Sequence, residues 1–168
     1  MCALAWLYEK TRRRIHHDRL GDLTGYCGDW VGMRASFQPA EPALRFRLPG
    51  NKQGPAPATV DQFEQLWSHL EAILERIWPA AWSEYQQLRE SYLDSPDDQK
   101  LVSEIDADFS KHWWLREIAL LRGSQNRLYW SLDFEVAWDP EHSRTAYLDL
   151  EENLLRYALS CAVIDPWQ

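Results

Sequence analysis

The strongest constraint on the fold is the stretch from Leu128 to Trp138. Apolar side chains occupy every second position of it, namely Leu128, Trp130, Leu132, Phe134, Val136 and Trp138. Successive side chains of a β-strand point to opposite faces of a sheet, so this pattern predicts a strand with one buried face. Asp133 and Glu135 fall on the other parity and are expected to point to solvent or to a partner.

The segments that flank this strand extend the prediction to a β-meander over residues 114–161. Residues 145–150 and 154–161 surround the short connection Glu-Glu-Asn, which is typical of a hairpin turn. Residues 114–121 alternate only in part, with Arg116 and Glu117 adjacent, so this segment fits either a strand or a helix.

The N-terminal third has a different character. Residues 1–17 suggest a short amphipathic helix with Leu4, Leu7 and Ile15 facing inward. Residues 21–48 are punctuated by glycines and end in an alternating pattern, in which Leu44 and two further apolar residues face opposite the arginines. This pattern predicts a β-hairpin.

The central segment, residues 59–93, has apolar residues at helical spacing. Thr59 followed by Gln62 resembles a capping box, which predicts the start of a helix. Pro79 is expected to break or kink it, and residues 101–109 fit a further short helix. We therefore expect one α+β domain over residues 1–168, in which an antiparallel sheet, built from the N-terminal hairpin and the C-terminal meander, packs against a long central helical segment.

Composition narrows the functional class. The formal net charge is −8, and residues 59–168 carry 9 Lys and Arg against 21 Asp and Glu. Such a surface repels phosphate backbones, so nucleic acid is not an expected partner, whereas a basic protein is. Ten tryptophans indicate a Trp-rich core.

The same composition bears on location. Three cysteines, Cys2, Cys27 and Cys161, match neither a zinc site nor a disulfide framework, which favours a reduced, cytoplasmic protein. Nothing in the sequence approaches the ~20 apolar residues of a membrane span, so no membrane association is expected.

The stretch Ala-Trp-Asp-Pro-Glu-His-Ser-Arg, residues 137–144, concentrates titratable side chains. Asp139, Glu141 and His142 are residue types that bind metal ions or transfer protons. Asp followed by Pro is equally typical of a β-turn that ends a strand, with Trp138 anchored in the core. The turn is the favoured interpretation, so no catalytic residue, metal site or cofactor is assigned.

The same stretch resembles a motif of bacterial immunity proteins, which neutralise toxins of polymorphic and type VI secretion systems. Their pattern is an alternating strand, Trp-Asp-x-Glu-His-Gly, and a hairpin. Trp138, Asp139, Glu141 and His142 match it, and Ser143 stands where the family has glycine.

The resemblance implies a non-enzymatic protein that binds a cognate toxin and occludes its active site. The expected toxin-binding residues are the outward carboxylates near the meander: Asp133, Glu135, Asp139, Glu141, Glu151 and Glu152. Two alternatives stay open. One is a small metal-dependent hydrolase that uses Asp139, Glu141 and His142, and the other is an adaptor or chaperone that loads an effector.

Overall fold

The alternating stretch near the C-terminus forms strand β7 (Leu128–Val136). The structure is a computed structural model that describes residues 13–26, 28–36, 43–91, 112–160 and 166–167. The inward side chains of β7 from Trp130 to Val136 are at most 1% exposed, so the predicted strand and its buried face are confirmed. The strand ends at Val136, two residues earlier than expected, because Ala137 and Trp138 already belong to a turn.

The described residues form a mixed α/β fold with a mostly antiparallel nine-stranded sheet. Its order is β1 (Arg13–His17), β2 (Gly21–Tyr26), β3 (Asp29–Ala35), β4 (Ala43–Asn51), β6 (Trp113–Arg122), β7, β8 (Arg144–Leu148) and β9 (Leu154–Leu159), while β5 (Gly54–Pro55) pairs with the end of β4.

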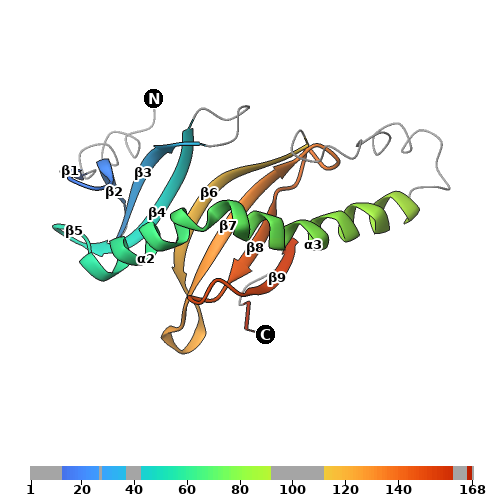
Figure 1. Ribbon diagram of the computed structural model, residues 1–168. Coiled ribbons are helices and arrows are strands. Elements are labelled where there is room, and N and C mark those ends of the chain that lie inside the picture. The colour runs from blue at the N-terminus through green and yellow to red at the C-terminus, as the bar shows by residue number, and fades with distance from the viewer. Residues whose placement is uncertain (1–12, 27, 37–42, 92–111, 161–165, 168) are drawn as a thin grey trace, which may run out of the picture.

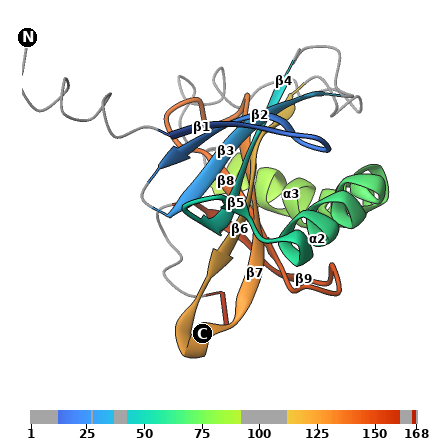
Figure 2. The same cartoon turned by 90° about the vertical axis from the view of Figure 1, so that its left-hand side faces the viewer.

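The N-terminal and C-terminal strands meet in one sheet because β4 and β6 are parallel neighbours, with Phe46 opposite Ile118. Parallel neighbours need a long crossover connection, and that connection contains both helices. The described part of the chain has two α-helices, α2 (Pro57–Ser68) and α3 (Leu70–Ser91). Both lie on the same face of the sheet (Figures 1 and 2).

The helices differ from the sequence prediction in three respects. Helix α2 begins at Pro57, after Ala56, without a side-chain cap, so the capping box at Thr59 is wrong. Proline suits this first position because its missing N–H is not needed there. The helical segment breaks at His69, while Pro79 lies inside α3, so a break at Pro79 is also wrong. Pro79 is exposed, and water can solvate the carbonyl that its ring leaves without a donor.

The core lies between the helices and the sheet, and tryptophans fill much of it. Trp30, Trp113, Trp130 and Trp138 are at most 5% exposed. Trp113 stacks on Phe134 with ring centroids 4.1 Å apart. Three further tryptophans on the helices, Trp67, Trp78 and Trp82, pack partly buried against the same core. The Trp-rich core is thus confirmed for these residues.

The expected helix over residues 1–17 is wrong in its described part, because Arg13–His17 is strand β1. Ile15 does pack against the core, but it does so on a strand, opposite Leu23 of β2. Residues 1–12, the expected short helix over residues 101–109 and the three cysteines lie outside the described residues.

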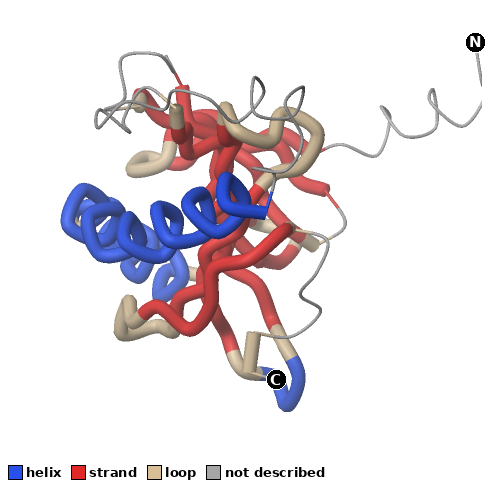
Figure 3. Tube along the Cα trace, turned by 90° about the vertical axis from the view of Figure 1, so that its right-hand side faces the viewer, coloured by secondary structure: helices blue, strands red, loops and turns tan. Residues whose placement is uncertain are grey.

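Strand β6 settles the open choice for residues 114–121. A β-bulge between Leu115 and Glu117 inserts one extra residue. The bulge changes which parity faces the core, so Leu115 and Ile118 are both buried. The tube view in Figure 3 shows the two long helices together on one side of the strands. Among the described helices, neither has the length and apolar character that a membrane crossing requires.

Candidate functional site

The connection between β7 and β8 contains the motif residues and is a turn. The backbone N–H of His142 donates to the carbonyl of Asp139 over 3.3 Å, which places Pro140 at the second position of a β-turn. Trp138 is 5% exposed and packs against Tyr85 of α3, with ring centroids 5.6 Å apart. The turn interpretation of this stretch is therefore confirmed.

Arg144, the first residue of β8, lies at the centre of a group of charged side chains at this end of the strand. Its side chain is 2% exposed. Its Nε donates to Glu84 Oε1 over 2.7 Å, its Nη1 to the carbonyl of His142 over 3.0 Å, and its Nη2 lies 3.0 Å from Asp139 Oδ2. Asp139 Oδ1 also lies 2.9 Å from His142 Nδ1. The motif turn thus folds around a buried guanidinium, and we call this set the Arg144 cluster.

The two carboxylates of the Arg144 cluster have pKa values displaced in opposite directions. Burial raises the pKa of Glu84, and Arg144 opposes that rise only in part. Burial also acts to raise the pKa of Asp139, but hydrogen bonds from His142 and Arg144 outweigh it, so that pKa lies below its usual value. Both groups serve as counterions of one buried cation.

The side chains of Asp139, Glu141 and His142 are not arranged as a set of metal ligands. Asp139 and His142 contact each other, and Asp139 also holds Arg144. Glu141 is exposed. Across the described ranges, no group of three or more His, Cys, Asp or Glu side chains is placed to hold a metal ion.

Asp133 faces away from the helices, as its parity predicted, but it is not simply solvated. Thr145 Oγ1 lies 2.6 Å from its Oδ1, and Ser131 Oγ lies 3.3 Å from the same oxygen. Ser131 and Thr145 are 4% and 2% exposed, so this part of the sheet face is covered. Glu135 is half exposed, and its Oε2 accepts a hydrogen bond from Arg116 Nε over 2.7 Å.

The opposite end of β8 leads into the turn Asp149–Asn153. Asn153 donates its backbone N–H and its side-chain amide to the Asp149 carboxylate, over 2.8 and 2.9 Å. Glu152 adopts a left-handed backbone with φ 66°, a conformation that costs a non-glycine residue ~1–3 kcal/mol. Such a residue persists only where its surroundings hold it in place.

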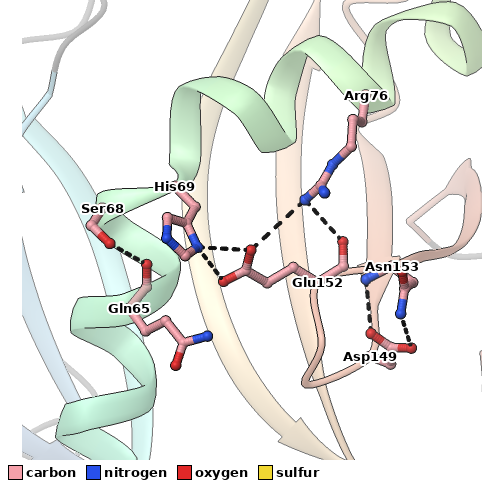
Figure 4. A network of polar contacts seen from close by, with 7 residues as sticks. All are labelled: Gln65, Ser68, His69, Arg76, Asp149, Glu152 and Asn153. Atoms are coloured by element: carbon pink, nitrogen blue, oxygen red, sulfur yellow. Dashed lines mark hydrogen bonds and ion pairs between the residues drawn. The ribbon is translucent and has the colours of Figure 1, made fainter.

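Helix α3 and the His69 junction hold Glu152. Both Glu152 carboxylate oxygens lie 3.0 Å from His69 Nδ1, and Arg76 Nη2 donates to the Glu152 carbonyl over 3.2 Å (Figure 4). Arg76 Nη2 also lies 3.8 Å from Glu152 Oε2. Glu152 is only 8% exposed, so its expected outward orientation is wrong. Its carboxylate ties the turn to the junction of α2 and α3.

A pocket of about 290 Å³ lies beside this network, between α3 and the turn that follows β8. We call it the α3–turn pocket. Its apolar wall consists of two isoleucines from α3 and two leucines that flank the turn, and its polar rim contains Arg76, Glu152 and Asn153; the wall residues are Ile73, Ile77, Leu148 and Leu154.

The structure does not bring the six predicted binding residues together. The motif turn and the Asp149–Asn153 turn lie at opposite ends of β8, whose five residues span roughly 17 Å. Asp133, Glu135, Asp139 and Glu152 each contact other side chains of the chain, as described above. Glu141 and Glu151 are exposed on the two turns. Whether any of the six binds a partner stays a prediction.

Sequence reasoning missed Arg144, Glu84, His69 and Arg76. A signal for Arg144 was present, because it shares its parity with the buried Ala146 and Leu148 of the same strand. The partners on α3 could not be found in this way, since 60 residues separate Glu84 from Arg144.

Comparison with known proteins identifies a family whose description gives no function. A family model described as "Domain of unknown function (DUF6985)" matches residues 20–151. The matched region includes the motif turn, the Arg144 cluster and most of the strands. No curated protein and no solved structure matches the chain.

Proposed function

The chain belongs to the family described as Domain of unknown function (DUF6985), and from its own charge and surface we propose that it is an immunity protein. In this proposal it binds one cognate secreted bacterial toxin in the cytoplasm and occludes the active site of that toxin. The observation that carries the proposal is the acidic excess of residues 59–168, with 21 Asp and Glu against 9 Lys and Arg. An acidic surface attracts a basic protein partner and accelerates its association.

The exposed carboxylates on the two turns of β8 support this role. Glu141 and Glu151 are exposed, so they remain able to attract a partner. Asp139 and Glu152 hold the turns in shape through Arg144 and His69. We assign the first pair to electrostatic steering and the second to preorganisation of the surface, which lowers the entropic cost of binding. The match of Trp138, Asp139, Glu141 and His142 to the immunity-protein motif adds to the proposal.

Co-expression with the product of the adjacent gene tests the proposal. That product should be toxic alone, harmless in the presence of this chain, and co-purified with it. If the product is not toxic, or if toxicity persists and no complex forms, the proposal fails. A complex that forms without rescue would instead identify an adaptor or chaperone. A stoichiometric metal that is lost in His142→Ala would identify the metal-dependent hydrolase.

The steering role has its own measurement. The double substitution Glu141→Gln with Glu151→Gln should lower the association rate with the toxin at low salt and leave the dissociation rate nearly unchanged. High salt should remove most of the difference from the wild type, because it screens exposed charges. Glu90→Gln with Asp18→Asn, which removes two exposed carboxylates, one in the last turn of α3 and one in the turn before β2, is the control with the same change of charge. An equal effect of the control would show that only net charge matters.

A further inference from the structure

The α3–turn pocket has the size and lining of a site for one long side chain. Its volume is about 290 Å³, just below the ~300–1,000 Å³ of typical small-molecule sites. We propose that this pocket receives a lysine or arginine side chain of the protein partner. The inference rests on the proposed toxin-binding function and names where, and with which residue type, the partner is anchored.

The wall of the pocket suits the aliphatic stem of such a side chain. Leu154 is only partly buried, whereas the other three wall residues are at most 1% exposed and form the floor of the pocket. Ile73 and Ile77 are one helical turn apart on α3, so their side chains lie on one helix face. Leu148 and Leu154 are paired across β8 and β9 and form the facing wall. Lysine and arginine bury their methylene stems along apolar surfaces while their charged ends reach polar groups.

The rim of the pocket suits a cationic end group. The Glu152 carboxylate is oriented by His69 and lies 3.8 Å from Arg76. An ionised carboxylate offers about four acceptor positions, so it can accept a further donor. This carboxylate is largely withdrawn from solvent, where charge-assisted hydrogen bonds are stronger than in water.

The charges of the surrounding elements favour a cation over an anion. The first two turns of α3, the turn after β8 and the start of β9 carry five carboxylates and two arginines, besides His69 at the helix junction. These groups are Glu71, Glu75, Asp149, Glu151, Glu152, Arg76 and Arg156. An anionic side chain would gain Arg76 and meet the field of the five carboxylates, whereas a cationic side chain meets complementary charge.

A titration with isolated side-chain analogues tests the pocket without the toxin. N-acetyl-L-argininamide is added to the full chain with methyl-labelled isoleucine and leucine, and the signals of Ile73, Ile77, Leu148 and Leu154 are followed by NMR. These signals should shift saturably. N-acetyl-L-norleucinamide, which has the stem without the charge, should bind about tenfold more weakly, and the glutamate analogue should not bind. No shift, or equal shifts with all three compounds, would overturn the proposal.

Two variants extend the test to the complex. Leu154→Trp fills the pocket and should raise the dissociation rate of the toxin complex by about tenfold or more, as the loss of an anchor does. Met33→Trp, at an exposed position of β3 away from both turns, should dissociate like the wild type. Circular dichroism and thermal melting establish that each variant is folded. Glu151 is exposed, so the Glu151→Lys variant should fold like the wild type. This variant should bind N-acetyl-L-argininamide more weakly.

The outcomes separate the pocket from the immunity proposal. If the chain neutralises the toxin and folded Leu154→Trp forms an equally long-lived complex, the pocket proposal is overturned and the immunity proposal stands. If no toxin complex forms but the arginine analogue still shifts the pocket methyl signals, the immunity proposal fails and the preference of the pocket for a cationic side chain stands.

Discussion

Substitution of Arg144 by methionine tests the interpretation that a buried ion cluster organises the motif turn. Methionine keeps the length and apolar volume of the arginine stem but removes the charge and the three nitrogens that carry the N–H donors. The Arg144 side chain is 2% exposed, and its partners Glu84 and Asp139 are 25% and 24% exposed. The substitution therefore leaves Glu84 without its cation and Asp139 with His142 alone. Removal of one partner from a buried ion pair typically costs ~3–5 kcal/mol of unfolding free energy.

The structure also ranks the related substitutions. Glu84→Gln and Asp139→Asn each leave Arg144 with one carboxylate and the His142 carbonyl, so each should cost less, about 1–3 kcal/mol. Arg116→Met is the matched control, because its ion pair with Glu135 has side chains 41% and 51% exposed. An exposed pair of this kind contributes only about 0–1 kcal/mol.

Urea denaturation followed by tryptophan fluorescence measures these differences, provided that the slope of the unfolding transition is unchanged. In the Arg144→Met background, Glu84→Gln should be neutral or stabilising, since it then removes an unpaired buried charge. The difference between the effects of Glu84→Gln in the two backgrounds is the coupling energy between Glu84 and Arg144. Its expected size is that of residues in one network. The interpretation is refuted if Arg144→Met and Arg116→Met have the same stability, or if Glu84→Gln costs the same in both backgrounds.

Two further predictions concern acid stability and packing. The pKa of Asp139 lies below its ordinary value of 3.8, so its ionised form stabilises the folded state above that pH, and this stability is lost as the pH falls through the lowered pKa. Asp139→Asn should therefore differ from the wild type at neutral pH and converge with it below about pH 3.8 in urea titrations, whereas a difference independent of pH would contradict this origin. Gly32→Ala would place a Cβ 2.3 Å from the Phe46 ring and should cost about 1–3 kcal/mol in thermal denaturation. Met33→Ala, at an exposed neighbour, should change stability by less than about 0.5 kcal/mol.

Local periodicity predicted most of the sheet because alternate residues of a strand point to the same face, so a buried face appears in the sequence as alternating apolar residues. Where that alternation is unbroken, as from Trp130 to Val136, the predicted strand and the observed strand agree. Residues 114–121 stayed ambiguous because the bulge after Leu115 shifts the parity within the strand. Arg13–His17 was misassigned because its strand conformation depends on pairing with β2, which a local pattern does not contain.

The candidate site was predicted less completely than the fold. The turn at Asp139 followed from local chemistry, since aspartate and proline favour that geometry themselves. The orientation of Glu152 did not follow, because its left-handed backbone is held by His69, 83 residues away in the sequence. The outward orientation predicted for the carboxylates therefore fails where a distant partner is present.

The sequence alone thus determined the alternating strands, the helical character of the central segment, the turn after Trp138 and the acidic balance, because each depends on neighbouring residues or on composition. The tertiary structure decided the parallel pairing of β4 with β6, the burial of Arg144 between Glu84 and Asp139, and the α3–turn pocket. Each of these depends on which distant segments pack together. That packing decides whether a charged side chain is a buried counterion or a solvated group.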